Sequence, residues 1–290
     1  MIDSLPSLSA LYVAFARGVA THDADLSRAC RDPAAVRLLP RPLRAVIRSA
    51  ERSPATARAL RYGSLGMFDH HAMRTGVIDH MLETAIGSGA RQVVLLGAGL
   101  DTRGHRMPGL AGLVVFEVDR AATQAFKRLR AHALEPQARE IRYVSCDFQR
   151  SKFEDALHAA GFDATLPCCI IWEGVTMYLS EAAFERSLAA LSKLCAPRST
   201  LILTYVTRTP ERQPSTWAPL HALLSAIAEP IRFASDTVDM AARLHSHGFR
   251  TLADEPPLAA HPKFEVVPIR LPIRNPLERE RIVCCVRVAP

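Results

Sequence analysis

Hydrophobic residues follow two different spacings along this chain of 290 residues. As far as about residue 90, apolar side chains recur every three to four positions, which is typical of helices packed on one side. The predicted helices are Ser4–Ala20, a stretch around Asp25–Leu39, Pro42–Arg61 and Phe68–Ile86. Because these helices come before any strand, they indicate an N-terminal helical cap over residues 1–90 rather than part of a sheet.

From Arg91 onward, short apolar runs rich in β-branched residues alternate with helical stretches. The predicted strands are Gln92–Leu96, Leu113–Val118, Ile141–Ser145, Cys168–Trp172 and Leu201–Val206, and the clearest helices between them are Ala121–Leu134 and Glu181–Leu194. Each run is apolar throughout, as expected of strands that are buried on both faces. The alternation predicts an α/β fold in which a parallel sheet carries helices on both faces.

Residues 207–236 interrupt this alternation with an irregular, proline-rich stretch. An insertion after the fifth strand is a natural place for a lid over a ligand. A helix at Val238–His247 and strands at Phe249–Ala253 and Arg281–Val288 follow, whereas Pro256–Pro276 shows no clear pattern. We therefore expect a core domain over residues 91–290, with its lid at 207–236.

Composition and charge narrow the possible partners. Hydrophobic residues make up 49% and charged residues 22% of the chain, which argues against disorder. The net charge is +7, but the arginines are scattered without a basic run, so we expect no nucleic-acid partner. No apolar segment approaches the roughly 20 residues of a membrane helix, and the first residues carry no targeting signal, so no membrane partner is expected. The seven cysteines include no C-x-x-C pair and indicate free, buried thiols in a reducing cytoplasm.

The strongest local signal is the sequence Gly97-Ala98-Gly99, which follows the first predicted strand. Glycines at this point let the backbone approach a ligand closely, where open α/β sheets bind cofactors. A dinucleotide-binding motif would place a third glycine or alanine three residues after Gly99, where this chain has Thr102. The departure weakens the prediction of a nicotinamide cofactor, and a simple tight turn remains an alternative.

Acidic residues follow the next three strands. Asp119 comes about 20 residues after Gly99, the spacing of an acid that binds ribose, although capping of the next helix is an alternative. Asp147 with Phe148 suits an exocyclic amine and a stacked ring, and Glu173 adds a third carboxylate. Because the carboxyl ends of parallel strands meet at one edge, these residues predict a cofactor with amine, ribose and carboxylate groups and no pyrophosphate.

Three segments together resemble the leucine carboxyl methyltransferase-like family of class I S-adenosylmethionine-dependent methyltransferases. They are Leu96–Arg103, Phe116–Asp119 and Trp172–Leu179. The resemblance implies a Rossmann-like, seven-stranded, mostly parallel sheet whose last strand is antiparallel. It also implies S-adenosyl-L-methionine as cofactor and S-adenosyl-L-homocysteine as product.

The resemblance assigns roles to single residues. The expected cofactor-binding residues are Arg74, Gly97, Ala98, Gly99, Asp119, Asp147, Phe148 and Glu173. Arg74 matches the family arginine that binds the methionyl carboxylate, a task that suits a bidentate guanidinium. Asp119 matches the ribose acid, Asp147 and Phe148 the adenine end, and Glu173 the acid near the methionyl amine and the reaction centre. Arg120 follows Asp119 where many relatives have proline, so the turn there is expected to differ.

The expected reaction is methyl transfer to an oxygen of a small molecule, either a carboxylate or a hydroxyl of a secondary metabolite. The net charge of +7 favours an anionic acceptor. The alternatives are carboxyl methylation at a protein C-terminus, an NAD(P)-dependent oxidoreductase and a non-catalytic cofactor-binding protein.

Besides Glu173, the candidates for catalysis are a histidine of the predicted helix Phe68–Ile86 and Tyr178. A hydroxyl acceptor would need a base, for which His71 and its neighbour His70 are candidates, although exposed helix positions are the more ordinary interpretation of both. Tyr178 could orient an acceptor oxygen, with a half-buried aromatic as the alternative. His245-x-His247 has no nearby carboxylate or thiol to complete a metal site, so no metal is expected.

Overall fold

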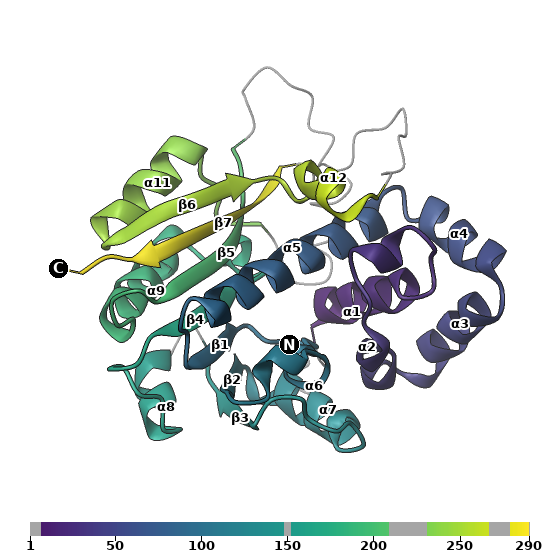
Figure 1. Cartoon of the computed structure of the whole chain (residues 1–290), viewed down its shortest axis with the longest axis horizontal. Coiled ribbons are helices and arrows are strands. Elements are labelled where there is room, and N and C mark those ends of the chain that lie inside the picture. Colours follow the sequence, from purple (N-terminus) through teal and green to yellow (C-terminus); the bar gives the residue numbers. More distant parts are fainter. Residues whose placement is uncertain (1–6, 148–151, 209–230, 267–278, 290) are drawn as a thin grey trace.

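The computed structural model describes residues 7–147, 152–208, 231–266 and 279–289. Seven strands of these residues form one sheet in the order β3-β2-β1-β4-β5-β7-β6 (Figure 1). Strands β1 to β5 are parallel, and β7 lies antiparallel between β5 and β6. The bounds are β1 (Gln92–Leu96), β2 (Val114–Asp119), β3 (Glu140–Ser145), β4 (Cys168–Trp172), β5 (Thr200–Val206), β6 (Phe249–Glu255) and β7 (Glu280–Arg287). This topology confirms the predicted Rossmann-like fold.

The register of the sheet brings the ends of the first four strands to one edge. Leu96 of β1 pairs with Val118 of β2, and Leu95 pairs with Ile171 of β4. β1 and β4 have the predicted bounds and are buried at every position, as the continuous apolar runs indicated. The residues that follow these strands therefore lie next to one another.

Helices cover both faces of the sheet (Figure 1). One core joins α1 (Leu8–Ala20), α2 (Pro33–Leu38) and α5 (Met67–Gly87) to the sheet, and the other joins α8 (Phe153–Ala159), α9 (Glu181–Leu194) and α11 (Thr237–Ser246) to it. Neighbouring cysteines divide between these cores, with Cys168 in the second and Cys169 in the first. All seven cysteines are free and buried, as predicted.

The N-terminal segment is helical, but two of the predicted stretches are each divided. The stretch around Asp25–Leu39 forms η1 (Leu26–Arg28) and α2 (Pro33–Leu38). The stretch Pro42–Arg61 forms α3 (Arg41–Arg52) and α4 (Pro54–Gly63). Pro54 cannot donate a backbone hydrogen bond inside a helix, so it begins a new one, which Ser53 caps by accepting from the backbone N–H of Thr56. Figure 1 shows α1 to α4 gathered around the amino-terminal half of α5, which itself crosses the sheet.

The remaining described elements complete the chain between and after the strands. They are η1 (Leu26–Arg28), α6 (Arg103–Arg106), η2 (Pro108–Leu110), α7 (Ala121–Ala131), η3 (Thr176–Tyr178), η4 (Pro257–Ala260) and α12 (His261–Phe264). The predicted lid at 207–236 lies mostly outside the described residues. The same holds for most of the second half of Pro256–Pro276. Helix α5 belongs to the predicted cap, yet it shares one hydrophobic core with the sheet. The division into a cap and a core domain therefore stays a proposal.

Candidate functional site

The turn after β1 is built on two glycines in the left-handed region. Gly97 has φ +69° and Gly99 has φ +49°. The backbone N–H groups of Gly97 and Ala98 both donate to Val118 O, at 2.8 and 3.0 Å. A Cβ on Gly97 would lie 2.3 Å from Cγ2 of Val175 in the loop after β4. The turn therefore needs glycine both for its conformation and for the close approach of another loop.

Asp119 lies at the end of β2, directly against this turn. Its Oδ2 accepts from Gly99 N at 2.5 Å, and its Oδ1 accepts from Arg120 N at 2.6 Å. Burial raises the pKa of Asp119 in spite of these hydrogen bonds, which act in the opposite direction. Arg120 has φ −62°, the value that proline would impose, so the backbone here is compatible with the proline that many relatives are expected to have.

Glu117, which shares a strand face with Asp119, points to different partners. It is fully buried, and its Oε2 lies 2.5 Å from Lys127 Nζ of α7. Burial raises the pKa of Glu117 to about 7 against the opposing influence of Lys127. Asp119 rather than Glu117 is thus the carboxylate of β2 that reaches the edge of the sheet.

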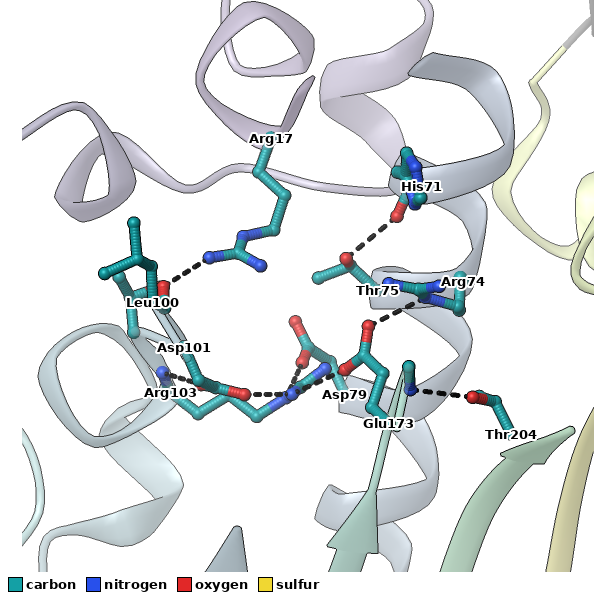
Figure 2. A network of polar contacts seen from close by, with 12 residues as sticks. Arg17, His71, Arg74, Thr75, Asp79, Leu100, Asp101, Arg103, Glu173 and Thr204 are labelled. Carbon is teal, nitrogen blue, oxygen red and sulfur yellow. Dashed lines mark hydrogen bonds and ion pairs between the residues drawn. The ribbon is translucent and has the colours of Figure 1, made fainter. Parts of the chain in front are cut away.

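Glu173, the residue after β4, lies between two arginines (Figure 2). Arg74 Nε of α5 donates to its Oε1 at 2.8 Å, and Arg103 Nη1 of α6 donates to its Oε2 at 2.9 Å. Burial alone would raise the pKa of Glu173, but Arg103 and Arg74 outweigh it and lower the pKa. The carboxylate is therefore ionised and fixed in orientation.

Arg74 has a second carboxylate partner, Glu280, which the sequence did not indicate. Its Nη1 donates to both oxygens of Glu280 at 2.9 Å, and His70 Nε2 lies 2.5 Å from Glu280 Oε2. Glu280 is completely buried at the start of β7. Burial opposes ionisation here too, yet Arg74 and the hydrogen bond with His70 hold the pKa of Glu280 well below its usual range.

Arg103 joins the turn after β1 to α5. Its backbone N–H and its Nη1 both donate to Asp101, and its Nε donates to Asp79 Oδ1 at 2.7 Å. Arg106 pairs with the other oxygen of Asp79 at 2.6 Å. The side chain of Arg103 is only 2% exposed, so the whole group is a buried ion network rather than a set of surface pairs.

Arg17 of α1 links the N-terminal helices to the glycine turn. Its Nη2 donates to Leu100 O at 2.6 Å, and its Nε donates to Asp32 Oδ2 at 2.8 Å. Thr102, the residue at the third-glycine position, donates to the same oxygen of Asp32 at 2.6 Å. Figure 2 shows the Arg17 guanidinium beside Leu100, with Arg74 and Glu173 across the network from it.

The two histidines of α5 are buried, so the more ordinary interpretation of them as exposed helix residues was wrong. His70 is 0% and His71 5% exposed, because every residue of α5 from 68 to 78 is buried. Burial, with Arg74 and His70 nearby, holds the pKa of His71 well below its usual range. The imidazole of His71 is neutral at physiological pH, and its Nδ1 has no hydrogen-bond partner among the described residues.

The other predicted site residues lie at or near the same edge. Asp147 follows β3 as predicted and is partly buried, whereas Phe148 lies outside the described residues. Tyr178 is half-buried on η3 and packs against Met177 and Val206. Their roles remain predictions.

Sequence reasoning missed several members of the charged network. They are Arg17, Asp32, Asp79, Asp101, Arg103, Arg106 and Glu280. One signal was available, because Asp101 and Arg103 belong to the polar continuation of the glycine motif. For Glu280 the only hint was a carboxylate at the first position of an apolar strand.

Metal-binding groups and membrane-spanning helices are both absent from the described residues. No three side chains of His, Cys, Asp or Glu in that part of the chain are grouped as a metal site. No described helix is long and apolar enough to cross a membrane.

Comparison with known proteins agrees with this geometry. Residues 10–192 match the family described as leucine carboxyl methyltransferase. A "Putative S-adenosyl-L-methionine-dependent methyltransferase" of Mycolicibacterium gilvum is 37% identical over 203 residues, covering 69% of this chain and 61% of the relative. A protein of the same description from Streptomyces coelicolor is 40% identical over 154 residues, covering 52% and 48%. The chain thus spans about half to three fifths of the length of these relatives.

Among solved structures, a "putative methyltransferase" from Thermobifida fusca aligns with 99% of this chain and 96% of its own. The TM-score is 0.60 at 16% identity, which shows a shared fold. Together with the matched family pattern, these likenesses show that the chain belongs to the leucine carboxyl methyltransferase family of S-adenosylmethionine-dependent methyltransferases.

Proposed function

We propose that the chain is an S-adenosylmethionine-dependent O-methyltransferase that acts on a small molecule. The observation that carries this proposal is the fixed carboxylate of Glu173 beside Arg74, at the edge where the glycine turn and Asp119 also lie. When bound, S-adenosylmethionine supplies an electrophilic methyl group on a sulfonium.

The residues at this edge fit the cofactor in both shape and charge. The left-handed glycines hold the turn after β1 in a conformation that other residues rarely adopt, so its backbone lies directly at this edge of the sheet. Asp119 would accept hydrogen bonds from the ribose, and Asp147 with Phe148 would face the adenine. Four arginines and five carboxylates form the network around Glu173, so the network has a formal charge of −1. This balance suits a cofactor whose net charge is positive.

Arg74 and Glu173 would position the methionyl part of the cofactor. Arg74 would bind the carboxylate, and Glu173 would accept from the ammonium group. Because Arg74 and Arg103 already fix Glu173, it needs no reorganisation when a ligand arrives. Alignment of the acceptor and exclusion of water would then supply most of the acceleration.

A carboxylate acceptor fits the site better than a hydroxyl. A hydroxyl must lose its proton, and His71 is the candidate base on α5. Its pKa lies well below the usual range, so it is neutral but weakly basic, a poor match for a phenol or an alcohol. A carboxylate is already ionised and needs no base. Tyr178 would then orient the acceptor oxygen, and His71 would line the site as a neutral side chain.

Two measurements test the proposal. Calorimetry should show binding of S-adenosylmethionine and not of NAD. Incubation of the protein and S-adenosylmethionine with a panel of aliphatic carboxylic, aromatic carboxylic and phenolic acceptors should release S-adenosylhomocysteine with at least one carboxylic acid. A Glu173→Gln variant serves as the control. Tight binding of NAD with none of S-adenosylmethionine would overturn the cofactor assignment. Turnover of phenols alone would overturn the preference for a carboxylate.

A further inference from the structure

A cavity of about 390 Å³ lies between α2 and the segment after α7, outside the network around Glu173. Its polar lining comes from Arg31, Arg37, His105, Arg106, Glu135 and Gln137. His105 and Arg106 belong to α6, whose first residue Arg103 contacts Glu173. Short helix α6 therefore has one end at the candidate active site and the other at this cavity.

The lining has an excess of positive charge. Arg31 and Arg37 are exposed, and neither forms an ion pair with any residue that the structure describes. Glu135 is the one carboxylate among the lining residues. Arg106 differs from the other two arginines, because it is paired with Asp79 at 2.6 Å and lies 3.6 Å from Asp32. It forms a fixed part of the wall, while Arg31 and Arg37 remain available to a ligand.

His105 adds a polar group without a partner. Its Nδ1 is buried and has no hydrogen bond within the described part of the chain. Burial, with Lys127 nearby, lowers the pKa of His105 to about 4. The ring is therefore neutral at pH 7 and carries one N–H that can donate to an oxygen acceptor.

A second cavity of about 510 Å³, at the amino ends of the strands, has the same charged groups in its lining, namely three arginines and one carboxylate. Arg142 there already donates to Glu140 and to Ala160 O, and the lining includes Asp163. Arg91 and Arg139 also line it and are exposed. The two linings therefore match in charge, and the first cavity differs by its histidine, His105, whose Nδ1 is unpartnered within the described residues.

We propose that the α2–α6 cavity binds a small organic polyanion through phosphate or carboxylate groups. Arg31 and Arg37 can each bind such a group through paired N–H donors, and His105 supplies a further donor. Pro33, Ala34 and Leu134 give the cavity an apolar wall, which a purely inorganic ion would leave uncovered. The site lies outside the proposed methyl-transfer centre and does not depend on its chemistry.

Calorimetry on the full chain tests the site with pyrophosphate and with citrate as separate probes. We expect saturable binding of at least one probe, and the comparison decides between phosphate and carboxylate. The double variant Arg31→Ala/Arg37→Ala should lose about tenfold or more in affinity, the scale of one charged hydrogen bond. The matched control Arg91→Ala/Arg139→Ala removes the same charge from the other cavity and should leave the affinity within about twofold, because screened distant charges contribute little.

A further variant, His105→Phe, should weaken binding severalfold while it keeps a planar ring. Circular dichroism and binding of S-adenosylmethionine report whether each variant is folded. No saturable binding of either probe up to about 10 mM, a range that covers affinities weaker than 1 mM, would overturn the proposal. Equal losses in the two double variants would do so as well, because they would show attraction by net charge alone.

Discussion

The Nη1 atom of Arg74 donates to both carboxylate oxygens of Glu280 at 2.9 Å, although the two residues are 206 positions apart. The contact joins the centre of α5 to the start of β7. It also leaves Nε of Arg74 to donate to Glu173 and directs Nη2 toward the turn at Gly174. A Cβ added to Gly174 would lie 3.7 Å from this Nη2 atom. Glu280 is thus a positioning residue for the arginine that we propose binds the cofactor.

Replacing Glu280 with Gln should destabilise the fold strongly. The amide keeps the shape of the side chain but removes the charge that balances Arg74 in a fully buried place. Breaking a buried ion pair costs about 3–5 kcal/mol, because one charge is left uncompensated. Urea unfolding measures this change. Glu181→Gln is the control, since Glu181 pairs with Arg243 on the surface and its loss should cost less than about 1 kcal/mol. Similar losses of stability in both variants would show that the buried pair of Arg74 and Glu280 contributes no more than a surface pair.

Arg74→Ala should weaken binding of S-adenosylmethionine by about 1.5–3 kcal/mol, the value of a hydrogen bond to a charged group. Calorimetry measures the affinity, and circular dichroism checks folding, because the substitution also leaves Glu173 and Glu280 without their shared partner. Arg58→Ala on the exposed side of α4 is the control and should have no effect. Unchanged affinity in a folded Arg74→Ala protein would remove Arg74 from the cofactor site.

Stability should fall in acid because of the same carboxylates. Burial opposes their ionisation, but the neighbouring arginines outweigh it and lower the pKa values of Asp32, Asp101, Glu173 and Glu280. A lowered pKa stabilises the fold above the unfolded value, which is about 4, and this stabilisation is lost as the pH falls toward the folded value. Urea unfolding between pH 4.5 and pH 3 should show the loss, because the raised pKa of Glu117 acts in the opposite direction only above its unfolded value. The slope with pH should be smaller in Glu280→Gln, and an equal slope would count against this account.

The edge of the sheet could be predicted from the sequence because its signals are local. A buried strand followed by glycine or an acidic residue predicts that Gly97, Asp119 and Glu173 lie at this edge. The prediction needs no knowledge of distant contacts. The same reasoning could not find Glu280 or Arg17, because their roles arise only when β7 and α1 pack against α5. The burial of His70 and His71 could not be predicted for a related reason. Polar residues in a helix normally indicate an exposed face, but α5 is enclosed on all sides over residues 68–78.

Gly97→Ala tests whether the glycine turn is needed for both fold and function. The new Cβ would meet Val175 Cγ2 at 2.3 Å, and φ +69° is unfavourable for alanine. Backbone strain and overpacking together should cost about 2–4 kcal/mol. Because the loop of Val175 follows directly on Glu173, its displacement should also weaken binding of S-adenosylmethionine.

Gly87→Ala is the matched control, since nothing lies within 4 Å of its new Cβ at the end of α5. That change should be neutral or stabilise by up to about 1 kcal/mol. Urea unfolding and calorimetry on both variants measure the two effects, and a Gly97→Ala protein with unchanged stability and affinity would show that the turn can move freely.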